Sequence, residues 1–339
     1  MADFHADKIK KILIIRWGGL GDLALCSAVI DDLVHAMPAA EFHLHTQPPW
    51  QQLFASDPRL SKVWDYPIRK RPPLEGLKWW LRLLREQRYD LIVDLQVNDR
   101  SWLLLALARI LGRAPRWIAS RRSGFPYTFR NTPHSTDVPA IELLRMPLKL
   151  LGIEVRANKP VLYSSDADIE AAHALLAELH GAPFGIVVPG CSAAGAHKRW
   201  GANNYIELSR RWLTGGEVMY IVILGAADEA DVCAEVAAGI GDTALNLCGQ
   251  TSLTQILPVV KQAQGLVSND TGVAHIAAAA GIPMVVICGP TLALRVKPLG
   301  NHVKALQIDP ACFKTHTPED CMARLGAAEV LAALQAIRY

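Results

Sequence analysis

The stretch that decides the fold is residues 265–280, which read G-L-V-S-N-D-T-G-V-A-H-I-A-A-A-A. The pattern predicts a short buried strand over 265–268, a polar turn, and a helix of small residues over 275–280. A helix start offers unpaired backbone N–H donors and a partial positive charge, so this turn suits a phosphate or diphosphate. The alternative is purely structural: Asp270 caps the helix, as aspartate does at many helix starts.

Strand-like and helix-like stretches alternate along the whole chain, which predicts an α/β protein with parallel sheets between layers of helices. The series restarts after about residue 166, and we expect the domain boundary near residues 158–166. We therefore expect two Rossmann-like, doubly wound domains facing a cleft, 1–165 and 166–339, with ligands at the carboxyl ends of the strands. The last predicted helix, 327–337, is a candidate to pack back on the first domain. The other predicted strands are 11–15, 41–46, 91–95, 185–188, 218–224 and 284–288, and the other predicted helices are 23–37, 101–111, 168–179, 205–213, 229–238 and 253–264.

Composition excludes several classes of protein. Of the 339 residues, 51% are hydrophobic and 20% are charged, which is typical of a globular rather than a disordered chain. No apolar run approaches the roughly 18–20 residues that cross a bilayer, and the first one, 12–15, is too short for a signal peptide core. We therefore expect a cytoplasmic protein. The seven cysteines are scattered without a C-x-x-C pair, so neither a disulfide framework nor a zinc site is indicated.

Charge is unevenly divided between the two halves of the chain. Residues 1–165 carry 24 Lys and Arg against 16 Asp and Glu, whereas residues 166–339 carry 11 against 16. Within 59–130 the count is 16 against 6. A basic first half indicates an anionic partner, and the alternative is a solvated basic surface without a ligand. No nucleic-acid-binding motif accompanies these residues, so nucleic acid is not an expected partner.

A glycine-rich loop follows the first predicted strand. Residues 16–22 read R-W-G-G-L-G-D, where glycines allow backbone turns and close approaches that a side chain would block. Residues 19–24 also fit G-x-G-x-x-A, the fingerprint of nicotinamide oxidoreductases. Such a site needs an acidic residue about 20 positions further on, at the end of the second strand. That strand instead ends in H-L-H-T at 43–46, with Glu41 at its start, which weakens the oxidoreductase interpretation. The loop glycines considered for the site are Gly18, Gly19 and Gly21.

Five segments together resemble glycosyltransferase family 9, the heptosyltransferases of lipopolysaccharide core assembly. The resemblance covers nearly the whole chain, and its specific part is the block at 268–291. It implies the GT-B architecture, with an N-terminal acceptor domain and a C-terminal nucleotide-sugar domain. It also implies an inverting, metal-independent transfer from ADP-heptose, without a cofactor. The segments are I-L-I-I-R-W-G-G-L-G-D at 12–22, P-G-C-S-A-A-G-A-H-K-R-W at 189–200, N-L-C-G-Q-T-S-L at 246–253, S-N-D-T-G-V-A-H-I-A-A-A-A-G-I-P at 268–283 and G-P-T at 289–291.

The resemblance implies roles for individual residues. Asp22 matches the catalytic base, which would take a proton from the acceptor hydroxyl as it attacks the anomeric carbon. Lys198 matches the lysine that binds the diphosphate and would stabilise the charge on the departing ADP. The donor-site motif matches Asp270, Thr271, Gly272 and His275. The alternatives that stay open are a helix cap for Asp22, a surface lysine at Lys198 and a core histidine at His275.

The acceptor would meet the basic residues of the first half. A basic helix expected over 76–85 carries two tryptophans that look exposed, Trp79 and Trp80. It either lies at a membrane interface or covers the sheet. Because bidentate arginines suit carboxylates and phosphates, we expect an anionic glycolipid acceptor of the lipid A/Kdo type. We also expect peripheral contact with the cytoplasmic face of the inner membrane. The candidate acceptor arginines are Arg69, Arg71, Arg121 and Arg122.

Other functions stay open at this point. The same fold could use another nucleotide sugar, or a protein or other glycan as acceptor. Val273 stands where proline commonly follows the glycine of the donor motif, which leaves the donor sugar less defined than the fold. A non-catalytic nucleotide-sugar-binding protein is a further alternative, although such a protein has no need of a base at Asp22.

Overall fold

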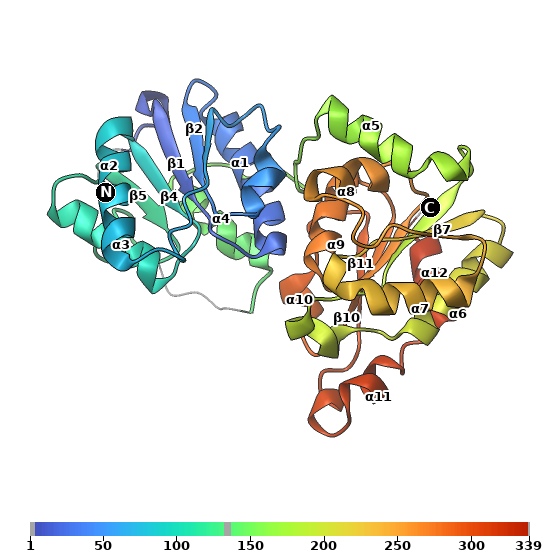
Figure 1. Ribbon diagram of the computed structural model, residues 1–339. Helices are drawn as coiled ribbons and strands as arrows, with labels where there is room; N and C mark the ends of the chain where they lie inside the picture. Colours follow the sequence, from blue (N-terminus) through green and yellow to red (C-terminus); the bar gives the residue numbers. More distant parts are fainter. Residues whose placement is uncertain (1–3, 132–136, 338–339) are drawn as a thin grey trace. The chain divides into compact units, whose positions relative to one another are not determined.

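The computed structural model describes residues 4–131 and 137–337, and the chain divides into two compact units, Met1–Ala157 and Asn158–Tyr339 (Figure 1). The division predicted from the sequence lay after residue 165. Each unit contains one sheet whose strands are all parallel and are joined by helices. The predicted α/β class with two Rossmann-like units is therefore confirmed.

The first unit has the strand order β3-β2-β1-β4-β5. Ile12 to Ile15 of β1 are fully buried, because a central parallel strand is covered on both faces. Helix α1 packs with α4 and helix α2 packs with α3, on the two faces of the sheet (Figure 1). The strand order reverses between β1 and β4, so ligands are expected there. The elements are β1 (Lys11–Ile15), β2 (Glu41–His45), β3 (Lys62–Trp64), β4 (Leu91–Asp94), β5 (Trp117–Ser120), α1 (Leu20–Ala36), α2 (Pro73–Gln87), α3 (Asp99–Ile110), α4 (Ala140–Leu150), η1 (Ala6–Lys8) and η2 (Trp50–Phe54).

The second unit repeats this winding with one more strand, in the order β11-β10-β9-β6-β7-β8. Its reversal point lies between β6 and β9. Helices α6, α7 and α12 pack on one face, and α5, α8 and α9 on the other (Figure 1). The elements are β6 (Phe184–Val188), β7 (Tyr220–Ile223), β8 (Ala244–Asn246), β9 (Leu266–Asn269), β10 (Met284–Cys288), β11 (Val303–Gln307), α5 (Asp166–Leu175), α6 (Ala202–Thr214), α7 (Ala230–Ile240), α8 (Leu253–Val260), α9 (Gly272–Ala277), α10 (Ala293–Val296), α11 (Pro318–Met322), α12 (Ala327–Gln335), η3 (Ala177–Leu179), η4 (Ala193–Lys198), η5 (Ala227–Glu229), η6 (Ala278–Ala280) and η7 (Cys312–Lys314).

The last helix, α12, packs on its own unit, against α6 and the strands β10 and β11. Val330 and Leu334 supply its buried stripe. None of the helices in residues 4–131 and 137–337 has the length and apolarity that a membrane crossing requires.

The tryptophans of α2 face the protein interior, so the expectation that they are exposed was wrong. Trp80 is fully buried with Leu83 and Leu84. Trp79 stacks on Tyr66, with ring centroids 4.4 Å apart and an interplanar angle of 6°. The spacing of these apolar residues places them on one stripe of the helix, which the sheet covers. Helix α2 is therefore a cover helix, and its outer face carries the basic side chains.

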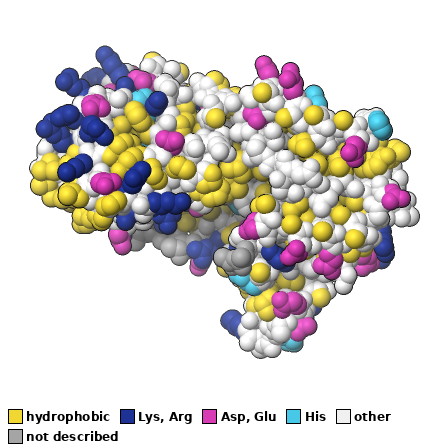
Figure 2. Space-filling model, viewed as in Figure 1, with side chains coloured by type: hydrophobic (Ala, Val, Ile, Leu, Met, Phe, Trp, Pro, Cys, Tyr) yellow, Lys and Arg dark blue, Asp and Glu magenta, His cyan; other side chains and the backbone are white. Residues whose placement is uncertain are grey.

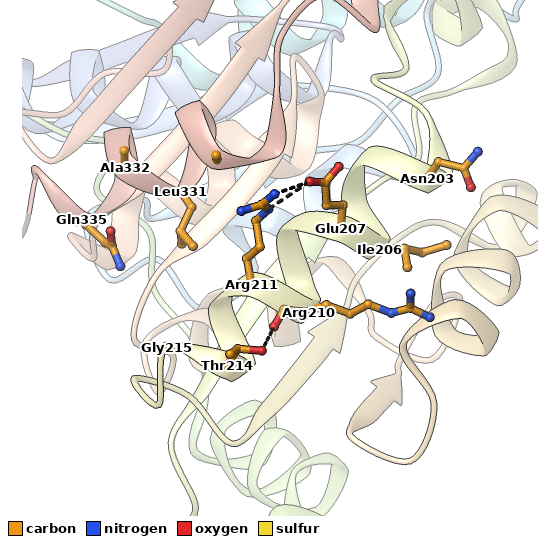
Figure 3. A pocket seen from close by; sticks show the side chains of 11 residues that line it. Asn203, Ile206, Glu207, Arg210, Arg211, Thr214, Gly215, Leu331, Ala332 and Gln335 are labelled. Carbon is orange, nitrogen blue, oxygen red and sulfur yellow. Dashed lines mark hydrogen bonds and ion pairs between the residues drawn. The ribbon is translucent and has the colours of Figure 1, made fainter.

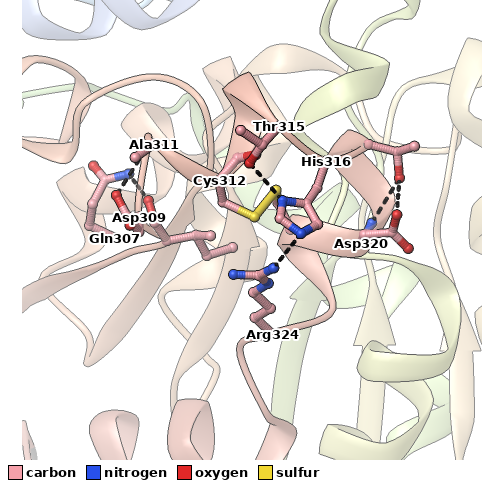
Figure 4. The surroundings of a disulfide bond; sticks show 11 residues. Gln307, Asp309, Ala311, Cys312, Thr315, His316, Asp320 and Arg324 are labelled. Carbon is pink, nitrogen blue, oxygen red and sulfur yellow. Dashed lines mark hydrogen bonds between the residues drawn. A yellow bond between two sulfur atoms is a disulfide. The ribbon is translucent and has the colours of Figure 1, made fainter.

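One disulfide joins Cys312 and Cys321, whose Cα atoms are 5.8 Å apart (Figure 4). The scattered cysteine spacing had not indicated it, because only the turn between η7 and α11 brings the two residues together. His316 lies within 4.8 Å of both sulfur atoms and is hydrogen-bonded to Thr315 and Arg324. Sulfur atoms bonded to each other are not thiolates, and thiolates are the form of cysteine that binds metals. In the disulfide state, Cys312 and Cys321 therefore form a covalent link and supply no thiolate to a metal.

Candidate functional site

The glycine loop joins β1 to α1 and brings several predicted residues together. Gly19 has φ +81°, and a Cβ at this position would lie 2.7 Å from Oδ2 of Asp22. The positive φ favours glycine here, and any other side chain would also displace the carboxylate of Asp22. A Cβ on Gly18 would lie 3.7 Å from Nη1 of Arg69, so this arginine reaches the loop. Gly21 lies in the first turn of α1.

Asp22 also lies in the first turn of α1, and its side chain is 42% exposed. The N-cap of the helix is Gly19 and no side chain caps it, so the interpretation of Asp22 as a helix cap was wrong. Its carboxylate instead accepts a hydrogen bond from the guanidinium of Arg16. Arg16 also donates to the carbonyl oxygen of Leu95, at 2.6 Å. These contacts hold Asp22 at the carboxyl ends of β1 and β4.

A pocket of about 180 Å³ lies beside Asp22. Its polar lining comes from Arg16, Asp22, Asp94, Gln96 and Arg121, and its apolar wall includes leucines and a proline of α4. The side-chain oxygen of Gln96 accepts a hydrogen bond from the backbone N–H of Trp17, at 2.7 Å. The pocket thus combines two carboxylates with two cations at the reversal point of the first sheet, where doubly wound folds bind ligands.

Asp94 also lines this pocket, as a fully buried carboxylate that the sequence pattern did not single out. It accepts hydrogen bonds from Ser101 Oγ at 3.0 Å and from Tyr127 Oη at 2.9 Å. It also accepts from the backbone N–H groups of Gln96 and Val97. Burial raises the pKa of Asp94, and these hydrogen bonds act in the opposite direction. Val97 has φ +52°, which is strained for a β-branched residue, so the loop is held in an unfavourable conformation beside the pocket.

The four predicted acceptor arginines divide into two groups. Arg121 lines the pocket beside Asp22, and Arg69 lies next to the glycine loop. Arg122 instead forms an ion pair with Asp99, at 2.8 Å. Arg71 is exposed at the turn before α2. The structure therefore brings two of the four arginines to the site around Asp22.

In the second unit, Lys198 and Asp270 form an ion pair with 2.7 Å between Nζ and Oδ2. Asp270 is only 8% exposed and follows β9 directly. The N-cap of α9 is Thr271, so the interpretation of Asp270 as the helix cap was wrong. Lys198 is partly buried rather than a surface lysine. The pair lies at the reversal point of the second sheet, after β6 and β9.

The other donor-motif residues occupy the start of α9. The helix begins at Gly272, earlier than the predicted start at His275. The buried hydroxyl of Thr271 has no hydrogen-bond partner among the residues that the structure describes. A buried polar atom without a partner is unfavourable, so this hydroxyl is available to a ligand atom. His275 is buried on the same helix, one turn further on.

Asn269, at the end of β9, was missed by the sequence reasoning although it stands next to the predicted motif. Its amide nitrogen donates to the carbonyl oxygen of Pro189 at 2.8 Å. Its amide oxygen accepts from the N–H of Trp200 and from Tyr205 Oη, each at 3.1 Å. A single buried side chain thus ties the loop after β6 and the segment after Lys198 to the end of β9. This arrangement fixes where Lys198 lies.

A second buried carboxylate, Glu229, lies at the same edge of this sheet. It accepts a hydrogen bond from the backbone N–H of Ala226, at 2.9 Å, and burial raises its pKa. A Cβ on Gly190 would collide with its carboxylate. Gly190 therefore allows the loop after β6 to approach Glu229 closely.

A separate groove of about 800 Å³ lies between α6 and α12 (Figure 3). Figure 3 shows Arg211 turned toward Glu207, with which it forms an ion pair at 2.8 Å. Thr214 Oγ1 donates to the carbonyl oxygen of Arg210. None of the site residues predicted from the sequence lines this groove.

Comparison with known proteins shows the family and the fold of the chain. The family model described as glycosyltransferase family 9 (heptosyltransferase) matches residues 79–323. Lipopolysaccharide heptosyltransferase 2 of Salmonella typhimurium is 24% identical over 324 residues, covering 88% of each chain. A glycosyl transferase family 9 structure from Veillonella parvula superposes with a TM-score of 0.83 at 17% identity, covering 98% of both chains. The structure of E. coli ADP-heptose lps heptosyltransferase II superposes with a TM-score of 0.77 at 20% identity, covering 96% of this chain and 98% of the other.

Proposed function

The chain belongs to glycosyltransferase family 9, the heptosyltransferases, and on that premise we propose that it moves a heptose from ADP-heptose to a lipopolysaccharide core acceptor of the lipid A/Kdo type. The names of its relatives support ADP-heptose as the donor and lipopolysaccharide as the acceptor. One observation carries the assignment of the chemistry. A half-exposed carboxylate, Asp22, opens onto a pocket that also holds Arg16 and Arg121.

Asp22 is the general base of the proposed reaction. The acceptor hydroxyl loses its proton to the carboxylate as its oxygen bonds to the anomeric carbon, and the bond from that carbon to the diphosphate oxygen breaks. Attack on the face opposite the leaving group inverts the anomeric centre. Arg16 orients the carboxylate through its hydrogen bond, and Arg121 is available to an anionic group of the acceptor.

Lys198 stabilises the negative charge that develops on the departing ADP. Its ammonium has three N–H donors, so it contacts Asp270 and still has donors for a diphosphate oxygen. The hydroxyl of Thr271 and the backbone N–H of Gly272 provide further donors at the start of α9. These groups support a transfer that needs neither a metal ion nor a cofactor.

The proposed acceptor is an anionic glycolipid, so the enzyme must reach a lipid surface. We place its work at the cytoplasmic face of the inner membrane, where it would bind peripherally. The first unit is basic, and the tryptophans of α2 are covered rather than exposed. Electrostatic attraction between its basic side chains and anionic headgroups is therefore the first contribution to membrane binding.

The experiment that tests the donor is a thermal-shift titration with ADP-heptose, ADP, UDP-sugars, GDP-sugars and NAD, each with and without magnesium. A ligand that binds the folded state raises the melting temperature by mass action. We expect a shift with ADP-heptose and ADP that does not depend on magnesium. A shift with UDP- or GDP-sugars alone would keep the fold and reject the heptose donor. A shift with NAD alone would reject glycosyl transfer.

A transfer assay separates an enzyme from a protein that only binds the sugar nucleotide. Detergent-solubilised core glycolipid is incubated with ADP-heptose, and the mass of the glycolipid is followed. We expect a gain of one heptose and the release of ADP. Binding of ADP-heptose without a mass gain on core glycolipids, other glycans or proteins would indicate a non-catalytic protein.

A further inference from the structure

Helix α3 is apolar on its outer face as well as on its inner one. Its inner side packs Leu104 and Leu105 into the core of the first unit. On its outer side Leu103 is 50% exposed and Ile110 is 70% exposed, and Leu111 just after the helix is 53% exposed. In a soluble protein a helix that is apolar all round is normally buried. Among the residues that the structure describes, none therefore covers these three side chains on the outer face of α3.

Two neighbouring segments extend this apolar face. Leu74 at the start of α2 is exposed, and so is Phe125 in the loop after β5. The indole N–H of Trp102 donates to the carbonyl oxygen of Phe125 at 2.8 Å, which joins the loop to α3. Among the described residues of the first unit, the exposed large hydrophobic side chains all belong to these segments. They are Leu74, Trp102, Leu103, Ile110, Leu111 and Phe125.

The apolar face is bordered by cations. A groove of about 400 Å³ between α2 and the end of α3 is lined by four basic side chains and two leucines, and no acidic side chain of the described residues lines it. Glu86 is 3.8 Å from Arg85, but exposed pairs of this kind contribute little. Figure 2 shows dark blue and yellow side chains next to each other over the part of the view where Figure 1 draws α2 and α3. The groove residues are Lys78, Leu81, Arg82, Arg85, Leu111 and Arg113.

We propose that this apolar and basic face of α2, α3 and the 125 loop docks on an anionic lipid bilayer. Long basic side chains extend their charged ends to phosphate groups, while leucine, isoleucine and tryptophan enter the boundary with the acyl chains. Neither feature alone gives firm membrane binding, but an apolar insertion combined with a basic patch does. Residues 59–130 carry 16 basic and 6 acidic side chains, so an anionic surface is the complementary partner.

The proposal of this docking face rests on the proposed function in one respect, because a glycolipid acceptor places the enzyme at a membrane. The face differs from the interface expected from the sequence, which relied on Trp79 and Trp80. Trp80 is buried and Trp79 is partly buried, whereas the exposed apolar residues come from α3, the start of α2 and the 125 loop. Docking through α3 would hold the first unit against the lipid that carries its acceptor.

The test is sedimentation of the purified full chain with lipid vesicles and no substrate. One set of vesicles contains phosphatidylcholine alone, and the other contains equal parts of phosphatidylcholine and phosphatidylglycerol. We expect binding to the anionic vesicles only, with affinity falling as salt rises. Each basic side chain near such a surface strengthens binding by about fivefold. The double variant Arg82→Gln with Arg85→Gln should therefore weaken binding more than tenfold, as should Leu103→Ser with Ile110→Ser.

Matched controls come from the second unit. Met219 is 57% exposed and Lys304 is exposed, so Met219→Ser and Lys304→Gln remove comparable groups elsewhere. These controls should bind vesicles as the wild type does, and all variants should keep the wild-type melting temperature. A wild type that binds neither kind of vesicle would overturn the proposal. Equal loss of binding in the control variants would overturn it as well.

Light scattering tests whether a second copy of the chain, rather than a membrane, covers this face. If the wild type forms a dimer that Leu103→Ser with Ile110→Ser dissolves, while vesicles are not bound, the face is an interface between two copies and membrane docking is rejected. The vesicle result also stands apart from the transferase assignment. Vesicle binding without any thermal shift from ADP-heptose would retain the docking face and reject the proposed donor.

Discussion

The ammonium of Lys198 lies 2.7 Å from a carboxylate oxygen of Asp270, across 72 positions of sequence. Each residue was singled out from a different segment, and the fold makes them partners at the carboxyl ends of β6 and β9. Asp270 is nearly buried, so the ammonium compensates a carboxylate that would otherwise be unfavourable there. The same ammonium is the proposed contact for the diphosphate of the donor.

Lys198→Ala should therefore weaken both donor binding and turnover. The substitution removes a donor to the diphosphate and leaves Asp270 without its partner. Truncating one partner of a comparable buried charge pair costs about 2 to 5 kcal/mol of binding free energy. We expect kcat/KM for ADP-heptose to fall at least about tenfold, with a raised KM. Steady-state kinetics with Lys304→Ala as the control would measure this. Unchanged KM and kcat in Lys198→Ala would remove this lysine from the site.

Asp22→Asn should abolish transfer and leave ADP binding nearly intact. The amide keeps the size of the side chain and cannot accept the hydroxyl proton, and loss of a general base lowers turnover by about 10²- to 10⁴-fold. Transfer is followed by the release of ADP, and ADP binding by thermal shift. Asp65→Asn, at an exposed position, serves as the control. Wild-type turnover by Asp22→Asn would exclude its role as the base.

Asn269→Leu should destabilise the second unit. The leucine leaves the carbonyl of Pro189, the N–H of Trp200 and the hydroxyl of Tyr205 without their partner. Buried groups left unsatisfied in this way lower the free energy of unfolding by about 1 to 3 kcal/mol each, less whatever water recovers. We expect a fall of several degrees in the melting temperature, compared with none for Asn203→Ala at an exposed position. Equal melting temperatures would show that other contacts hold this loop.

Protonation of His45 should make the first unit less stable at acidic pH. His45 is fully buried, and burial lowers its pKa from 6.5 to about 4. Its Nδ1 lies 3.1 Å from the indole N–H of Trp17 and accepts a hydrogen bond, so a proton on Nδ1 has no acceptor to meet. Below pH 6.5 the unfolded chain binds the proton first. Stability is therefore lost as the pH falls from 6.5 toward 4, by about 3 kcal/mol over this window.

The measurement for His45 is the free energy of unfolding of the full chain as a function of pH. His45→Gln does not titrate, so its slope between pH 6.5 and 4 should be shallower than that of the wild type. His5→Gln, at an exposed position, should keep the wild-type slope. Parallel curves for the wild type and His45→Gln would contradict the assignment.

Reduction of the disulfide should loosen the segment between η7 and α11. A link across nine positions stabilises the folded state by about 2.5 kcal/mol in the chain-entropy description. We expect dithiothreitol to lower the melting temperature of the wild type and to leave the double variant Cys312→Ser with Cys321→Ser unchanged. A wild type that melts alike with and without dithiothreitol would show that the link adds no stability.

Continuous apolar strands were the easiest elements to predict. The strands 11–15 and 284–288 coincide with β1 and β10, because buried parallel strands are apolar along their whole length. Helix starts were less accurate. Helix α3 begins at Asp99, two residues before its predicted start, because Asn98 and Ser101 form a capping box. Short or irregular elements such as β3, and α4 with its internal Pro147, carried no clear pattern.

The sequence by itself determined the α/β class, the winding of two similar units, and the glycine that the loop needs at Gly19. These follow from local periodicity and from backbone conformations that only certain residues adopt. Tertiary structure alone decided that Arg16 meets the carbonyl oxygen of Leu95, that Lys198 meets Asp270, and that Trp79 packs on Tyr66. Such contacts depend on which strands become neighbours and on which face of each helix the sheet covers. Residues far apart along the chain meet only when the strand order brings their carboxyl ends together, and no local pattern specifies that order.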